Sequence, residues 1–441
     1  MSDHQGLTDT ATVERRGAMA YASARTVRMA YCFVNRHPGP VEVWLALPPE
    51  LPTQRSVRVC DLTPEPISVQ PDGNGINRLA FFELAPGESL RFTVQAELYR
   101  AACDPSAPGA DATLDATARA NYLRSSALIR VTEEVRAEAL HIVAGATTPL
   151  EQARRLYIHL IKHYQYKWPP PARGSESMRR NRRGDCGEYS FLYAAWCRAL
   201  GIPCRVMVGT FAHGRMRAHV WNEVFIDGIG WMPADSSIYQ TPLRLPVLAD
   251  LDWALQRIHT RFGQLAADRL VFSIDPDVPL QPPYQDRTAP ATYERISMGG
   301  RPLAWGFESL DGAAPYLQPI YIRLGQARDI APSGALEGIL TAIWPPLAFQ
   351  TAALYLGDWR FADPLSRRLG TWLGLGGVAI GALSTLLAQF DIDVLHLPGT
   401  VGYVAFMVWL IRFSGMRWWK LALLLLQALS LVVAVLRLLA L

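Results

Sequence analysis

Short runs of β-branched, aromatic and aliphatic residues, separated by turn-forming residues, dominate the chain between residues 20 and 102. The runs are VRMAYCFVN, VEVWLALP, LAFFEL and LRFTVQAELY, and HPGP, PDGNG and APGE interrupt them. Such a pattern is typical of antiparallel strands joined by tight turns. It predicts an N-terminal β-sandwich over residues 20–102, with a disordered N-terminus over 1–19 before it and a linker over 103–115 after it.

Helical periodicity replaces this pattern from Ala116 to His163. Two apolar helix faces are expected, and Pro149 lies in the first turn of the second helix, where proline is tolerated. The stretch WPPPARG at 168–174 ends that helix. The first face comprises Leu128, Val131, Val135, Leu140, Ile142 and Val143, and the second comprises Ala153, Leu156, Tyr157, Leu160 and Ile161.

A further helix is predicted over residues 186–200. Asp185 and Glu188 have the spacing of a capping box at its start, and Gly201 with Pro203 signals its end. Cys186 therefore occupies the first helical position. There the helix dipole favours a thiolate, and the backbone N–H is free to hold an oxyanion. One apolar face is expected, made of Phe191, Leu192, Ala195, Trp196, Ala199 and Leu200.

Cys186 needs more than a helix end to react. Taken alone, a cysteine is more often a buried structural thiol than a nucleophile. Asp185 and Glu188 oppose the formation of a thiolate next to them, so a histidine partner is required. Cys197, in mid-helix, and Cys204, before an expected strand, lack this placement.

The segment that begins with AHVWNEVF supplies a histidine. Strand alternation puts His219 and Trp221 on one face, and Asp227, Gly228 and Gly230 mark a hairpin turn. A turn centred on Asp227 would set Asp235 directly opposite His219, and one centred on Gly228 would make it the diagonal neighbour. Either separation, about 5 to 8 Å, suits a carboxylate that orients an imidazole.

These residues form a candidate Cys-His-Asp triad in which Cys186 is the nucleophile, His219 the base and Asp235 the group that orients it. The upstream HYQYKW stretch could provide a second oxyanion donor, and Tyr166 is the candidate within it. Gly187 would let a substrate approach closely. Trp221 and Trp231 are residues of the core or walls of a substrate groove.

The combined motifs resemble the transglutaminase-like core of the papain-like thiol enzymes. They are GDCG (184–187), RALGIPCRVMVG (198–209), HVWNEVF (219–225) and GWMPAD (230–235), within a segment from about Leu156 to Ser237. The resemblance implies an α+β fold, the same three triad roles, and acyl transfer without a cofactor. Ser236 and Ser237 depart from the family pattern after the aspartate, which weakens any inference about the substrate.

Three functions follow from this resemblance. The first is a cysteine acyl-transfer enzyme that forms a thioester from a peptide or protein amide and passes it to water or an amine. The second is a non-catalytic scaffold that binds a partner chain in the same groove. The third is an acyltransferase that uses carrier-bound thioesters. The core, with a C-terminal extension, is expected over residues 116–335, in which PIYIRLG is predicted to be a late strand leading towards the membrane.

The region 338–441 is predicted to be a membrane region. Its runs Leu369–Phe390, Leu397–Ile411 and Leu421–Leu436 contain no charged residue, and a bilayer core needs about 20 apolar helical residues. Buried helices of a soluble domain are the alternative. A fourth run, Gly338–Leu356, contains Pro345 and Pro346, which break a helical ladder, so it is a kinked span or a re-entrant or interfacial segment.

Charge sets the expected orientation. Basic residues flank the first and third spans at 358–368 and 412–420, whereas the loop between them has only acidic ones, so both basic loops are expected in the cytoplasm. With three spans the N-terminal part is cytoplasmic too. With four spans it is on the opposite side of the membrane. The start of the chain lacks a signal-peptide core, which favours three spans of a multi-pass protein. In a bacterium this would be the inner membrane.

Net charge is only +4, and the six cysteines contain no C-x-x-C pair, which argues against a structural zinc site or a disulfide framework. No metal site is assigned. The run Arg179–Arg183 carries four arginines. It is either a solvated loop or a contact for an acidic substrate, a carrier protein or anionic lipid. Nucleic acid is disfavoured because no aromatic platform accompanies the arginines.

Overall fold

The computed structural model describes residues 13–35, 39–107, 112–167, 170–213, 218–237, 261–283 and 317–323, together with the short segments 296–298, 301–303, 313–314, 329–330 and 358–362. The three uncharged runs and the Pro345–Pro346 segment lie outside these ranges, so the membrane region stays a prediction. Within these ranges, no helix has the length and apolar character required to cross a bilayer.

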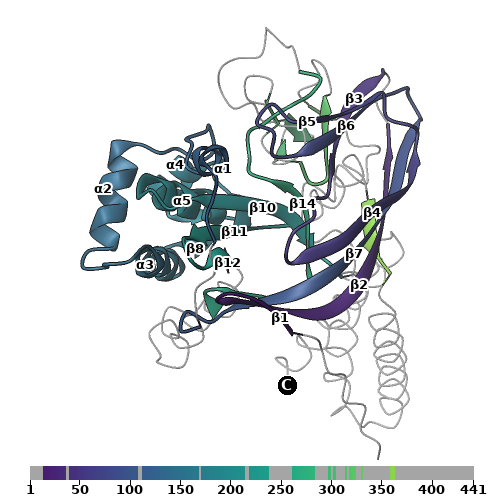
Figure 1. Ribbon diagram of the computed structural model, residues 1–441. Helices are drawn as coiled ribbons and strands as arrows, with labels where there is room; N and C mark the ends of the chain where they lie inside the picture. The colour runs from purple at the N-terminus through teal and green to yellow at the C-terminus, as the bar shows by residue number, and fades with distance from the viewer. Residues whose placement is uncertain are drawn as a thin grey trace, which may run out of the picture. The chain divides into compact units, whose positions relative to one another are not determined.

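Two antiparallel sheets contain the N-terminal strands (Figure 1). One follows the order β1 (Val13–Arg16), β2 (Met19–Val34), β7 (Ser89–Cys103) and β13 (Gln264–Leu265), with β4 (Gln54–Thr63) also paired to β7. The other follows the order β19 (Ile320–Arg323), β3 (Val41–Leu47), β6 (Arg78–Leu84) and β5 (Ser68–Pro71). All four predicted runs form strands.

Three features of these sheets differ from the prediction. Val13–Arg16 pair with β2, so the expectation of a disordered N-terminus over 1–19 was wrong for these residues. The strands β4 and β5 were missed, because many of their side chains are polar and exposed. The PIYIRLG stretch contributes β19, and Tyr321 packs against Trp44 of β3 with ring centroids 5.9 Å apart. It therefore completes an N-terminal sheet, a pairing that the sequence did not predict.

A third antiparallel sheet forms the centre of the core, in the order β12 (Gly230–Ala234), β11 (Ala218–Ile226), β10 (Cys204–Phe211) and β14 (Arg269–Ile274). The helix α5 (Cys186–Ala199) lies against β11, where Asn222 Nδ2 donates to the Ser190 carbonyl at 3.0 Å. The helices α2 (Glu133–Ile142), α3 (Pro149–His163) and α4 (Ser175–Asn181) also contact α5 (Figure 1). This is the predicted α+β arrangement.

The environment of each helix refines the sequence analysis. Every residue from Gly187 to Ala199 is buried, because sheet and helices enclose α5, whereas a single apolar face was expected. The predicted face of α3 is buried as expected. The helix α2 begins only after its N-cap Thr132, so Leu128 and Val131 precede it, and Leu140 is 50% exposed. A short helix, α1 (Ala116–Asn121), follows the linker.

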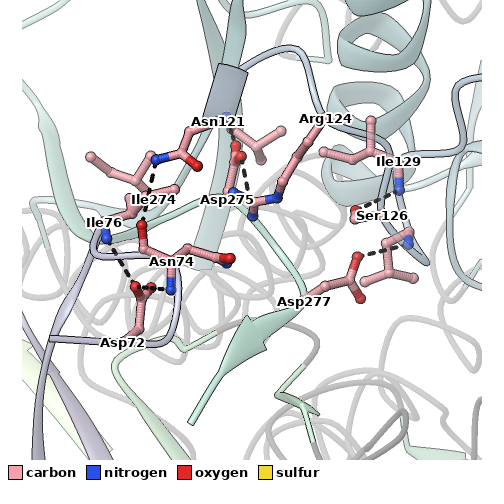
Figure 2. Close-up of polar contacts among 12 residues, drawn as sticks. Asp72, Asn74, Ile76, Asn121, Arg124, Ser126, Ile129, Ile274, Asp275 and Asp277 are labelled. Carbon is pink, nitrogen blue, oxygen red and sulfur yellow. Dashed lines mark hydrogen bonds and ion pairs between the residues drawn. The ribbon is translucent and has the colours of Figure 1, made fainter. Parts of the chain in front are cut away.

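The turn after β14 ties the helices to the central sheet. Asp275 accepts from Arg198 Nη2 of α5 at 2.7 Å and from the Val206 N–H of β10 at 2.8 Å. Arg124 Nη2, between α1 and α2, lies 3.7 Å from the same carboxylate (Figure 2). Asp277, two residues further on, accepts from the Leu128 N–H at 2.8 Å. A buried carboxylate thus joins α5, β10 and β14.

The β5–β6 turn contacts the end of β14 and the helix α1. Asp72 Oδ1 accepts from the N–H groups of Asn74 and Ile76, and Asn121 Nδ2 lies 3.4 Å from the Asn74 carbonyl (Figure 2). Asn77 donates to the Ile274 carbonyl at 2.9 Å and accepts from the Ile274 N–H at 2.7 Å. These contacts hold the N-terminal strands against the edge strand of the core.

Candidate active site

Cys186 is the first residue of α5, as predicted. The Gly187 N–H donates to Asp185 Oδ1 at 2.7 Å, and the Asp185 N–H donates to Glu188 Oε2 at 3.3 Å, which completes a capping box. A Cβ atom on Gly184 would lie 2.5 Å from the Glu188 Cβ. Glycine is therefore required at 184 for the chain to turn into the helix, which the sequence alone did not reveal.

The surroundings of Cys186 disfavour its thiolate. The residue keeps partial solvent exposure, but burial of the sulfur raises its pKa, and the charges of Asp185 and Glu188 raise it further. The backbone N–H of Val220 and the guanidinium of Arg173 act in the opposite direction and do not outweigh them. The thiolate that the helix dipole was expected to favour therefore does not form by position alone; it requires a base.

His219 and Asp235 are joined directly. The strands β11 and β12 pair Asn222 with Ala234 and Ile226 with Gly230, which centres the turn on Gly228, the second of the two predicted registers. His219 Nε2 lies 2.8 Å from Asp235 Oδ2, and both residues are buried. The Asp235 side chain thus fixes one nitrogen of the imidazole.

Arg269 of β14 contacts the same carboxylate oxygen at 3.0 Å. Burial raises the pKa of Asp235, but the charge and hydrogen bond of His219 and the guanidinium of Arg269 outweigh it, and the pKa falls to about 2. Asp235 is therefore ionised at neutral pH, and its hydrogen bond to His219 is accepted from an Nε2–H group.

Aromatic rings hold the imidazole plane. Phe211 stacks on His219 with centroids 4.6 Å apart, and Trp221 stacks with centroids 5.8 Å apart. The guanidinium carbon of Arg269 lies 4.1 Å from the centroid of Phe211. Trp221 is fully buried, so within this structure it supports the histidine.

Cys186 and His219 come from neighbouring elements. The start of α5 lies beside β11, where Val220, the residue after His219, approaches the sulfur with its backbone N–H. Among the described residues, the ring of His219 bonds to Asp235 but makes no hydrogen bond to the Cys186 sulfur. Catalytic hydrogen bonds are often long in the absence of substrate and tighten when it binds.

The remaining candidates occupy different surroundings. Tyr166 pairs with Gly184 in the parallel strands β8 (Gln165–Tyr166) and β9 (Arg183–Gly184). The strand β9 ends two residues before Cys186. The N–H of Gly187 already binds the Asp185 carboxylate. Trp231 pairs with Phe225, six positions along β11 from His219, which corresponds to about 20 Å. It packs on Arg205 with the guanidinium carbon 4.1 Å from its ring centroid.

Sequence reasoning missed the residues that surround the His219–Asp235 pair (the dyad) and the Asp185–Glu188 capping box (the cap). Arg173, Phe211 and Arg269 contact them, yet none belongs to a recognisable motif. Arg269 lies in the stretch RFGQLAADRLVF, downstream of the segment that carries the family motifs. In the part of the chain that the structure describes, no three His, Cys, Asp or Glu side chains gather to hold a metal ion.

Comparison with family models matches residues 136–236 to the transglutaminase-like superfamily. The matched range contains Cys186, His219 and Asp235. Residues 136–236 form a transglutaminase-like domain. The match agrees with the fold of α5 and the central sheet, and with the resemblance that the sequence motifs carry.

Solved structures that are similar to the chain were also found. One, described as a candidate cysteine protease from Cytophaga hutchinsonii, is 15% identical, has a TM-score of 0.41, and aligns over 49% of this chain and 78% of its own. The periplasmic domain of TgpA from Pseudomonas aeruginosa is 21% identical, with a TM-score of 0.32 and coverage of 55% and 78%. No curated protein matches the chain.

Proposed function

We propose that the transglutaminase-like domain catalyses covalent acyl transfer through Cys186. The observation that carries the proposal is the buried His219–Asp235 hydrogen bond of 2.8 Å, set beside the helix start that holds Cys186. A neutral thiol that requires a base, an ionised carboxylate and an imidazole fixed at one nitrogen are the parts that a cysteine acyl-transfer site needs.

The steps follow from these roles. His219 takes the proton from the Cys186 thiol, and the sulfur attacks the carbonyl carbon of a peptide or protein amide. The resulting oxyanion is stabilised by the N–H at the start of α5, with Tyr166 as the candidate second donor. His219 returns the proton to the departing amine, which leaves a thioester. Water or a second amine, deprotonated by His219, then releases the acyl group and regenerates the thiol.

The test uses p-nitrophenyl acetate as a small acyl donor. The full-length protein is mixed with it, the release of p-nitrophenolate is followed, and the acetylated residue is identified by peptide mass spectrometry. We expect acetylation of Cys186, absence of this product in Cys186→Ala, and at least a 100-fold slower reaction in His219→Ala. Acetylation that is unchanged in His219→Ala would contradict the proposal.

The fate of the acetyl group separates hydrolysis from aminolysis. Acetyl-Cys186 is isolated and exposed to buffer alone or to glycine methyl ester. Faster loss with the amine, accompanied by acetylglycine methyl ester, supports transamidation, and equal loss supports hydrolysis. Replacing the donor by a pantetheine thioester tests the third reading, an acyltransferase that uses carrier-bound substrates.

A non-catalytic scaffold is the second candidate. It is favoured by one observation: among the described residues the raised-pKa thiol of Cys186 makes no hydrogen bond to the His219 ring. A scaffold would give the same slow acetylation in the unmodified protein, His219→Ala and Asp235→Asn. The three rates therefore decide between a scaffold and an enzyme.

Membrane anchoring through residues 338–441 is likewise a proposal, supported by the uncharged runs in the sequence. It predicts that the full chain stays with membranes after carbonate extraction, and that a thiol label impermeant to vesicles reports the side of Cys186. Recovery in the soluble fraction would contradict it. The arginines in and after α4 are proposed to attract an acidic substrate. Arg180 is exposed but lies 3.5 Å from Glu176 Oε2, and Arg179 lies 3.0 Å from the same oxygen.

A further inference from the structure

Arg173, in the segment before α4, is buried against the cap of the nucleophile helix. Its side chain is 4% exposed, and its Nη1 atom lies 3.0 Å from Asp185 Oδ2 and 3.1 Å from Glu188 Oε2. The next residue, Gly174, also directs its backbone N–H towards Glu188 Oε1, at 3.4 Å. One guanidinium therefore bridges both carboxylates of the capping box that precedes and follows Cys186.

These two carboxylates need a counter-charge. The Glu188 residue is fully buried and Asp185 is 6% exposed, and a buried charge without a partner is costly. Burial raises the pKa of Glu188 to about 8 and the neighbouring Asp185 adds to the increase, whereas Arg173 opposes it, so the charge of this carboxyl depends on its counter-charge. Negative charge held beside the Cys186 sulfur also makes a thiolate less favourable. The cap that shapes the helix start thus works against the reaction that the site is proposed to perform.

We propose that Arg173 is a positioning residue that balances the charge of the Asp185–Glu188 cap, so that Cys186 can ionise when His219 takes its proton. The inference rests on the proposed function of Cys186. It assigns a role in thiol reactivity to the segment between α4 and the end of α3 at His163, which precedes the predicted helix-ending stretch 168–174.

Other charged groups come from the elements around the helix start. His219 comes from β11, Asp235 follows β12, and Arg269 of β14 acts on Asp235. Arg182, before β9, and Arg183, its first residue, are exposed to solvent, where their effect is screened. Arg173 is the cation that contacts both cap carboxylates, so its removal changes the charge of the cap without touching the dyad.

The experiment measures the rate at which iodoacetamide alkylates Cys186 in the full-length protein, by peptide mass spectrometry over a series of pH values. Arg173→Gln should raise the pH midpoint of alkylation by about one unit, which is about a tenfold lower rate below the midpoint. Arg173→Lys, which keeps the charge, should lie between Arg173→Gln and the unmodified protein.

A charge-balanced double variant distinguishes charge from folding. Asparagine caps a helix as well as aspartate does, so Asp185→Asn removes one negative charge and preserves the cap. Asp185→Asn alone should lower the midpoint, and Arg173→Gln with Asp185→Asn should restore the rate to within about threefold of the unmodified protein. If Arg173→Gln does not fold, the double variant is compared with Asp185→Asn, and it should be about tenfold slower.

Two results would overturn the role of Arg173. One is an unshifted midpoint in Arg173→Gln; the other is a double variant as slow as Arg173→Gln alone, which would assign the loss to structure. Failure of the proposed function looks different. In that case p-nitrophenyl acetate does not acetylate Cys186 in the unmodified protein, and this holds whatever alkylation rates the Arg173 variants show.

Discussion

The Oδ2 atom of Asp235 lies 2.8 Å from His219 Nε2 and 3.0 Å from Arg269 Nη2. One buried oxygen thus receives a bond from a base in β11 and a cation in β14. The arginine holds the carboxylate in its ionised form, and the carboxylate holds the imidazole with one nitrogen engaged. Four properties of the protein should depend on this arrangement and on the sheet that carries it.

Asp235→Asn should slow acetylation of Cys186 by at least about 100-fold, because an amide cannot stabilise the imidazolium that forms on His219. The rate of p-nitrophenolate release measures this effect. Tyr157→Phe is the matched control, since the Tyr157 hydroxyl donates to the backbone carbonyl of Asp235 at 3.2 Å and leaves the carboxylate untouched. Its rate should stay within about threefold of the unmodified protein. Equal losses in both variants would mean that general loosening of the loop is responsible.

Stability should fall in acid through the titration of Asp235. Its pKa is lowered from 3.8 to about 2 in the folded chain, so its contribution is fully present above about pH 4 and is lost as the pH falls towards 2. The shift corresponds to about 2 kcal/mol. Urea unfolding at a series of pH values, compared with Asp235→Asn, measures it. A variant with the same acid dependence as the unmodified protein would exclude Asp235 as the source.

Arg269→Gln should lower the free energy of unfolding by about 3 kcal/mol, because it leaves a buried carboxylate with one charged partner fewer. Arg323→Gln is the control: Arg323 pairs with Glu42 at 2.8 Å, but both side chains are partly exposed, and such a pair contributes at most about 1 kcal/mol. Urea denaturation compares the two. A similar small loss in both variants would show that the Arg269–Asp235 contact is worth no more than a surface pair.

Gly209→Ala should be severely destabilising, since a Cβ at this position would lie 2.1 Å from the Leu270 carbonyl oxygen, where β10 and β14 shift register. Gly201→Ala is the matched substitution. Gly201 has a φ of +78° with open space around its Cβ position, so only backbone strain of about 1 kcal/mol is expected. Thermal melting of both proteins tests the pair. Comparable melting temperatures would contradict the close approach of the strands.

The sequence was informative where local rules decide the structure. Capping chemistry located the start of α5 and the position of Cys186, and strand alternation with turn glycines limited the His219–Asp235 register to two options. The structure selected one of them through the pairing of Ile226 with Gly230. The transglutaminase-like fold could be predicted because its motifs occur in order in one continuous segment.

The rest depended on contacts between distant parts of the chain. Arg269 reaches Asp235 from 34 residues downstream, and β19 joins β3 although hundreds of residues separate them. The sequence predicted that Asp185 and Glu188 raise the pKa of Cys186, but the larger effect of burial could not be predicted. The helix dipole is a local effect that the sequence reveals, whereas desolvation of the sulfur depends on how α5 and β11 pack.

The carboxylate of Asp275 limits how the protein can be shortened. A fragment that ends at residue 236 would retain Cys186, His219 and Asp235. It would leave the buried guanidinium of Arg198 without the Asp275 carboxylate, and it would remove Arg269 from Asp235. The stretch shared with the family therefore carries the reactive groups but lacks Asp275 and Arg269, the buried partners of Arg198 and Asp235. Any attempt to graft this chemistry onto another scaffold must also bring along the strand that follows it by some thirty residues.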